Sequence, residues 1–189
     1  DDYFALLDDN EGEFNNDLVD IGVGRFPAST LSGANVLVDK VEQYYVKESF
    51  GSWRNDITFI ADDGDANDGN THMWQADSLA NIVADNYINI NINKIYLDNY
   101  LQESTPGGPR SVVAQNAINK RVDKGALLIN YTGHGGPLGW TQERILELDQ
   151  ISAWDNRNKL PLFMTATCKF SYFDNPEQTS AGEYVLLNP

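Results

Sequence analysis

The amino-acid sequence predicts an α/β fold, with a mainly parallel sheet and flanking helices arranged in three layers (αβα). Short apolar runs alternate along the chain with segments whose apolar residues recur at helical spacing, as in strands joined by crossover helices. The 189 residues suffice for one such domain with a sizeable core, or for two small lobes that share a sheet. Hydrophobic residues make up 41% of the chain and aromatic residues 11%, so the chain has apolar surface to bury.

The N-terminal part is predicted to contain an extended segment, a helix and a strand. Residues 19–30 (VDIGVGRFPAST) indicate an extended segment that closes with Pro27 and a Ser/Thr helix cap. Residues 34–45 then carry apolar side chains on one helix face, and residues 56–61 (DITFIA) form a compact run typical of a buried strand. Residues 1–28 are less regular. Their strands either pair antiparallel at a sheet edge or belong to a separate lobe.

The rest of the chain repeats this alternation. We treat residues 1–189 as a single fragment with approximate sub-lobes 1–110 and 111–189. Ser180, with Glu183 three residues later, indicates a capping box before a last helical pattern. In chain order we predict a loop over 61–72, a helix over 73–88, a strand over 93–98, a loop over 102–109, a helix over 111–123, a strand over 125–131, a helix around 143–154 and a strand over 160–167.

The composition excludes some classes of function. The formal net charge is −15, so nucleic acid is not an expected partner, because little on this chain would neutralise phosphates. The single cysteine excludes an intrachain disulfide but does not exclude secretion. No apolar run approaches the roughly 18 residues of a membrane helix. The acidic start, DDYFALLDDN, is not a signal peptide, and with the abrupt end it leads us to expect a piece truncated from a longer protein.

Two predicted strands end in the same way. The run ALLINYTGHGG carries one of two histidines, His134, and the run LPLFMTATC carries the only cysteine, Cys168. The two residues are 34 positions apart with one helical crossover between them, so we expect the two strands to be parallel neighbours. Because ligands bind beyond the carboxyl ends of such strands, the imidazole and the thiol are expected to lie within reach of each other.

This pair predicts nucleophilic catalysis. A thiolate is the nucleophile, and a nearby histidine accepts the thiol proton and later protonates the leaving amine. The backbone N–H groups of Gly135 and Cys168 are our candidates for an oxyanion hole. Taken alone, each residue also has an ordinary structural reading, because a cysteine after a strand is usually a small buried hydrophobe. Their coincidence at two similarly built strand ends favours the catalytic reading.

The same residues carry a resemblance to a known family. YTGHGG followed by a tryptophan, and then KLPLFMTATCKF, resemble the gingipain-type cysteine peptidases of family C25, which share the caspase-like fold and a His–Cys dyad. DIGVGRFPAST resembles the entry to the catalytic region of that family, and FIADDGD its first core strand and loop. The resemblance covers nearly the whole chain. It implies His134 as the general base and Cys168 as the nucleophile that forms the acyl-enzyme.

Further segments resemble one branch of the family, the sortases of the type IX secretion system. These segments are INYTGHGG, TATCKFSYFDNP, SAGEYVLLNP and NKIYLDNY. The resemblance implies an outer-membrane protein on the extracellular face of a bacterial cell. Its implied partners are the C-terminal signal domains of secreted cargo, an amine on lipopolysaccharide as acceptor, and other secretion-system components. The family chain continues with a Gly-rich strand beyond the point where this chain stops, which leaves the activity of the fragment alone open.

The acidic loop ADDGDANDGNTH gives two further expectations. Its closely spaced carboxylates could supply the oxygen ligands of a structural calcium ion, although the spacing is not that of an EF-hand. One of them, with Asp63 or Asp65 favoured, could orient the imidazole as a third catalytic member. The alternative for the whole loop is a solvated turn. The candidate calcium ligands are Asp62, Asp63, Asp65 and Asp68.

Two other residues and two other functions stay open at this stage. Trp140 is a candidate wall of the substrate pocket, or else packs in the core or at its rim. His72 either approaches the site or only contributes to the first turn of a helix. A zinc hydrolase would use His72, His134 and Cys168 as ligands, although their spacing matches no recognised zinc motif. A catalytically inert, peptidase-like surface binding module is the other alternative. The peptidase itself requires no cofactor.

Overall fold

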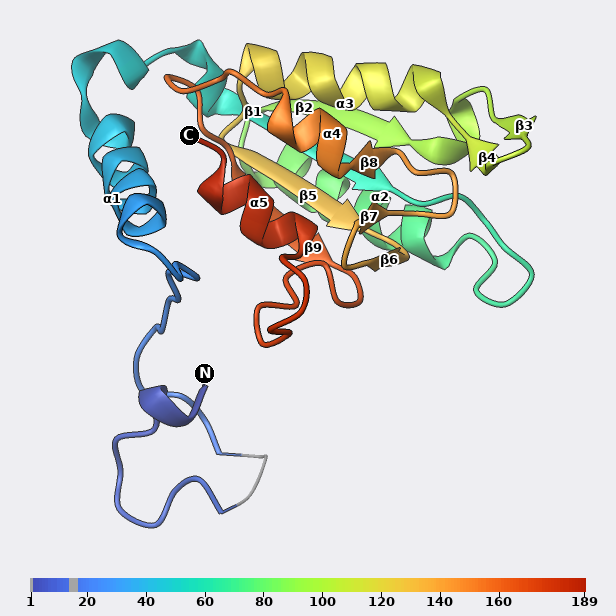
Figure 1. Cartoon of the computed structure of the whole chain (residues 1–189). Helices are drawn as coiled ribbons and strands as arrows, with labels where there is room; N and C mark the ends of the chain where they lie inside the picture. Colours follow the sequence, from blue (N-terminus) through green and yellow to red (C-terminus); the bar gives the residue numbers. More distant parts are fainter. Residues whose placement is uncertain (1, 14–16) are drawn as a thin grey trace.

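A four-stranded parallel sheet forms the centre of the computed structural model, which describes residues 2–13 and 17–189 (Figure 1). Its strand order is β2-β1-β5-β9, and all three pairings are parallel. Strands from both predicted sub-lobes therefore form one sheet. The strands are β1 (Asp56–Ala61), β2 (Asn91–Tyr96), β5 (Leu128–Thr132) and β9 (Leu162–Ala166).

Helices cover both faces of this sheet, which confirms the predicted three layers. Helix α2 (Thr71–Asn86) packs Ala76 and Ala80 against the face of β1 that carries Ile57 and Phe59. The opposite face is covered by α3 (Val112–Lys124), α4 (Leu148–Ser152) and α5 (Ala181–Leu187). Strand β1 is buried on both faces, which is why its sequence is a continuous apolar run and not an alternating one.

Strand β9 differs from its neighbours because it is the last strand of the sheet. Leu162 and Met164 point away from the covered face and are 63% and 54% exposed. Phe163 points the other way and stacks on Trp154. The sequence 160–167 predicts a strand correctly, but it does not reveal this edge position.

The N-terminal segment contains no strand among the residues described before α1 (Leu31–Tyr45). Its one regular element is the 3-10 helix η1 (Asp2–Ala5), and residues 14–16 lie outside the described residues. The predicted edge strands of residues 1–28 are therefore not found in the part that the structure describes. The predicted helix cap is confirmed, because the Thr30 side chain accepts a hydrogen bond from the N–H of Gly33 at 3.1 Å.

Two of the elements predicted from the sequence, a helix and a loop, differ in the structure. The expected helix around 143–154 is reduced to α4, because Thr141 and Arg144 have φ angles of 60° and 50°, which no helix accepts. The chain instead forms a small antiparallel sheet of β6 (Gly135–Gly136), β7 (Gly139–Trp140) and β8 (Leu146–Glu147). The expected loop 102–109 is a hairpin of β3 (Glu103–Thr105) and β4 (Gly108–Arg110).

The remaining elements are short. No helix of the described residues is both long and apolar enough to cross a membrane. The short strands are β3 (Glu103–Thr105), β4 (Gly108–Arg110), β6 (Gly135–Gly136), β7 (Gly139–Trp140) and β8 (Leu146–Glu147), and the other 3-10 helices are η2 (Lys47–Ser49), η3 (Ser52–Asn55) and η4 (Leu97–Asn99).

Candidate active site

The predicted pairing of the two strand ends is confirmed. The last paired residues of β5 and β9 are Thr132 and Ala166, and His134 and Cys168 each follow two residues later. Beyond the strands, the N–H of Gly133 still donates to the carbonyl of Ala166 at 3.3 Å. The imidazole and the thiol therefore leave the sheet from adjacent, parallel segments at the same edge.

The glycines around His134 are required by close packing. A Cβ at Gly133 would lie 2.5 Å from the Cβ of Asp62, and a Cβ at Gly135 would lie 2.5 Å from the Oγ1 of Thr167. Gly136 is different, because a Cβ there would have nothing within 4 Å. Gly133 and Gly135 thus let the His134 segment lie directly against its neighbours, including the residue that precedes Cys168.

The backbone of His134 is held on both sides. Its N–H donates to the Asp62 carboxylate at 2.9 Å, and its carbonyl accepts from the Tyr131 hydroxyl and from the N–H of Thr141. Asp62 is only 3% exposed, and burial, helped by the charge of Asp63, raises its pKa to about 7. Asp62 is therefore a positioning residue for His134. Sequence reasoning missed this role, although the pair of aspartates directly after β1 was a signal.

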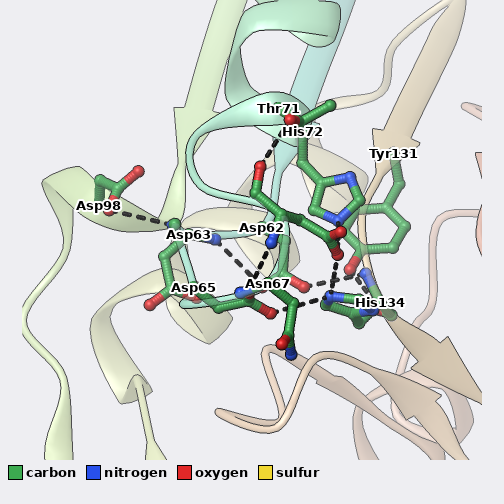
Figure 2. Close-up of polar contacts among 11 residues, drawn as sticks. Asp62, Asp63, Asp65, Asn67, Thr71, His72, Asp98, Tyr131 and His134 are labelled. Carbon is green, nitrogen blue, oxygen red and sulfur yellow. Dashed lines mark hydrogen bonds and ion pairs between the residues drawn. The ribbon is translucent and has the colours of Figure 1, made fainter.

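The imidazole of His134 faces the acidic loop (Figure 2). Its Nε2 lies 3.2 Å from Oδ2 of Asp65 and 3.1 Å from Oδ2 of Asp68, and the side chain is 48% exposed. Backbone N–H groups of the loop, and then His134, lower the pKa of Asp65, which favours its carboxylate form. In the described part of the chain, no hydrogen bond or ion pair joins Asp63 to His134, and Asp63 instead accepts a hydrogen bond from Gln102 at 2.9 Å. Of the two proposed orienting residues, the structure brings only Asp65 to the imidazole, and it adds Asp68.

Cys168 is exposed at the end of β9, and Lys169 after it has a φ of 55°. Within the described residues no hydrogen bond joins the thiol to His134, whose Nε2 contacts the carboxylates of Asp65 and Asp68. In a free enzyme such contacts are often loose and tighten only around the substrate. The N–H groups of Gly135 and Cys168, the candidate oxyanion donors, lie on the two segments that meet at Thr167.

The start of α5 joins the two segments, which sequence reasoning did not anticipate. The N–H of Ala181 donates to the carbonyl of Pro137 at 2.7 Å, and the N–H of Gly182 donates to the carbonyl of Phe170 at 2.8 Å. The first carbonyl belongs to the His134 segment and the second to the Cys168 segment. The predicted capping box of Ser180 and Glu183, which begins this helix, is confirmed.

Trp140 is not a pocket wall. The side chain is fully buried and stacks on Tyr131 with ring centroids 4.2 Å apart, and Phe163 and Phe170 lie against it. It belongs to the core beneath the site, because the turn after His134 folds back as β7 and carries the indole inward.

The four aspartates proposed for calcium do not lie together: three of them belong to two separate groups of possible ligands, and Asp65 belongs to neither. Asp62 and Asp63 lie with Glu143, whereas Asp68 lies with His72 and His134. Each set offers ligand atoms within 4.8 Å of one another. Among the described residues, no such group contains Cys168, so the structure does not bring His72, His134 and Cys168 together as the ligand set of the zinc hydrolase considered above.

A cysteine and a histidine at adjacent strand ends of this fold are the arrangement expected of a cysteine peptidase. All of residues 1–189 match the model of Peptidase family C25, and the chain belongs to that family. No curated protein matches the chain.

Solved structures share the fold at low sequence identity. The Arg-specific cysteine proteinase gingipain R (RgpB) is 21% identical with a TM-score of 0.70, over 92% of this chain and 38% of that one. A complex of the pro- and mature domains of Porphyromonas gingivalis RgpB is 21% identical with a TM-score of 0.69, over 89% of this chain and 37% of that one. A structure described only as a protease is 20% identical with a TM-score of 0.60, over 85% and 32%. The chain thus spans less than two fifths of these proteins.

Proposed function

We propose that this domain is a cysteine endopeptidase in which Cys168 attacks the scissile carbonyl and His134 transfers the proton. The observation that carries the proposal is the register of β5 and β9, which gives the two residues equal positions beyond adjacent parallel strands. Two glycines that leave no room for a side chain and the hydrogen bonds from α5 keep the segments together.

The chemistry proceeds in two steps. His134 accepts the thiol proton while the sulfur bonds to the carbonyl carbon, and the same proton then passes to the leaving amine as the C–N bond breaks. Each N–H that bonds the intermediate oxyanion contributes about 3–4 kcal/mol, and Gly135 and Cys168 are the proposed donors. The resulting thioester is consumed by water, which completes hydrolysis, or by an amine, which completes transpeptidation.

The finer proposal is a sortase that resembles PorU of the type IX secretion system. It would remove C-terminal signal domains from secreted cargo at the bacterial cell surface and pass the new carboxyl end to an amine on lipopolysaccharide. Support comes from the resemblance of INYTGHGG, TATCKFSYFDNP and NKIYLDNY to that branch. Peptidases with other substrates share this fold, so the fold alone does not identify the substrate.

The decisive experiment follows cargo processing in the whole protein. Cys168→Ala and His134→Gln should each abolish processing, whereas Gln178→Ala, in an exposed loop, should leave it intact. Iodoacetamide should modify Cys168 rapidly near neutral pH, and His134→Gln should slow that reaction by tenfold or more, on the order of a general-base effect. Undiminished processing by Cys168→Ala would end the peptidase proposal. Slow labelling of the wild type, with His134→Gln making no difference, would favour the inert binding module.

A further inference from the structure

Asp68, His72 and His134 form a compact group of metal-ligating side chains beside the proposed dyad. The Oδ2 of Asp68 lies 3.1 Å from Nε2 of His134 and 3.6 Å from Nε2 of His72. The two imidazole rings meet edge to face with centroids 4.9 Å apart. One ligand atom from each residue falls within 4.8 Å of the others. Figure 2 shows His72, in the first turn of α2, and His134, just beyond the end of β5, facing each other beside the loop that precedes α2 and contains Asp68.

These separations suit a tetrahedral ion. Zinc binds imidazole nitrogen and carboxylate oxygen at about 2.0–2.1 Å, so two ligand atoms of a tetrahedral site are about 3.3 Å apart. The two Asp68 distances lie on either side of that value. Because His134 is 48% exposed, a fourth position is accessible to water.

His72 gives a second, independent indication. Both of its ring nitrogens are shielded from solvent, and neither has a hydrogen-bond partner among the described residues. Nδ1 therefore loses its interaction with water without a replacement, and Nε2 has only the Asp68 carboxylate at 3.6 Å, beyond hydrogen-bond distance. A metal ion between the rings would satisfy one of them.

The charge around the group favours a dication. In the described part of the chain, the ion pairs of Asp65 and Asp68 involve only the two histidines, so no Lys or Arg neutralises these carboxylates. Asp65 contacts Nε2 of His134 at 3.2 Å and adds negative charge next to the site.

We propose that Asp68, His72 and His134 bind a divalent transition metal of the zinc class, and that this metal reversibly inhibits the enzyme. The metal takes the lone pair of Nε2 of His134, so the neutral imidazole carries its proton on Nδ1 and has no nitrogen left to accept the proton of Cys168. The metal site stands on the three residues alone, whereas the inhibition rests on the proposed peptidase function. The ligand set differs from the calcium expectation, because calcium takes oxygen ligands and imidazole suits zinc, copper and nickel.

The first test measures zinc binding to the whole protein by calorimetry and by competition with a chromogenic chelator. Zinc should bind at this site, and His72→Gln or Asp68→Asn should weaken binding by more than about tenfold. Asp85→Asn, at the exposed far end of α2, is the matched control and should bind zinc like the wild type. Cys168→Ser should also bind zinc normally, because the thiol is not a ligand. Excess calcium should not displace the zinc.

The second test compares cargo processing with and without buffered zinc in each variant. Zinc should suppress processing by the wild type, and the ratio of the two rates should move towards one in His72→Gln. Imidazole signals of both histidines should shift together in NMR spectra when zinc is added, which also reports that each variant is folded. Equal zinc binding by His72→Gln, or loss of binding in Cys168→Ser, would overturn the site. Zinc binding as described in a protein without peptidase activity would leave the site standing and remove the proposed function.

Discussion

Asp62 shows how a single buried carboxyl group connects pH to the geometry of the site. It is 3% exposed and accepts hydrogen bonds from the N–H groups of His134 and Asp63 at 2.9 and 3.1 Å. These bonds favour the carboxylate, but burial outweighs them and raises the pKa to about 7. The group that holds the backbone of His134 is thus half protonated near neutral pH.

We predict that Asp62→Asn changes the pH dependence of stability. The folded pKa of Asp62 lies above the unfolded value, so its contribution is fully present below about pH 4 and is lost as the pH rises through about 7. The variant keeps an oxygen acceptor but cannot ionise. The free energy of unfolding of the variant should therefore rise relative to that of the wild type between pH 4 and pH 8, by up to a few kcal/mol. Urea unfolding across this range measures the effect, with Asp85→Asn as the control. A constant difference between Asp62→Asn and wild type would contradict it.

The two glycines beside His134 give the next prediction. A methyl group at Gly133 would meet Asp62 and Tyr131, and one at Gly135 would meet Thr167, so alanine at either position should cost about 1–3 kcal/mol of stability. Gly136→Ala is the matched control, because open space surrounds that position. Denaturant unfolding measures the three variants. Equal stability of Gly133→Ala and Gly136→Ala would show that the segment relaxes around the added group.

Helix α5 acts at the level of an element, because its first turn holds both reactive segments. Ser180 and Glu183 shape that turn, and the N–H groups of Ala181 and Gly182 donate to Pro137 and Phe170. The helix has only seven residues and depends on its cap. Loss of the cap should therefore disturb the alignment of the two segments as well as the helix.

Ser180→Ala tests this. We expect it to cost about 1 kcal/mol of stability and also to slow the alkylation of Cys168 that depends on His134. Thr30→Ala is the matched control. It removes the cap of α1 at a similar cost in stability, but the Thr30 side chain bonds the N–H of Gly33 and neither reactive segment. Iodoacetamide labelling of the two variants at matched stability separates the roles. If both variants label at the wild-type rate, α5 does not align the site.

The elements that the sequence predicts well are those whose burial is uniform. DITFIA (56–61) matches β1 residue for residue, because both of its faces are covered. The helix expected around 143–154 does not form over its full length, because Thr141 and Arg144 adopt positive φ. The spacing of apolar residues does not reveal these backbone angles. Within the site, the sequence predicts that the strands before His134 and Cys168 are neighbours, because the chain between them is long enough for only one helical crossover. The contacts of Asp62 and Asp68 with His134, and of Ala181 with Pro137, do not follow from it, because each joins residues more than 40 positions apart.

On the scale of the whole molecule, β9 leaves an apolar surface open to solvent. Leu162 and Met164 lie on the face that α2 covers over β1 but not over β9, and β9 has no further strand beside it among the described residues. An open cavity of about 620 Å³ between α1, β9 and α5 also exposes apolar groups, among them Leu162, Tyr44 and Val185. Unpaired strand edges of this kind favour association.

We therefore predict opposite effects for two neighbouring residues of β9. Met164→Lys should leave the free energy of unfolding within about 0.5 kcal/mol and reduce self-association of the chain in sedimentation experiments. Phe163→Ala, on the covered face against Trp154 and Trp140, should cost about 2 kcal/mol or more. Similar losses of unfolding free energy from Met164→Lys and Phe163→Ala would mean that the outer face of β9 is covered in solution.

The hydrogen bonds from α5 reach main-chain carbonyls, which every amino acid possesses. The loop from Ser171 to Thr179 can therefore change its side chains without releasing either anchor, since none of them supplies the N–H or C=O groups at Pro137, Phe170, Ala181 and Gly182. Sequence variation in this loop is therefore compatible with an unchanged alignment of His134 and Cys168.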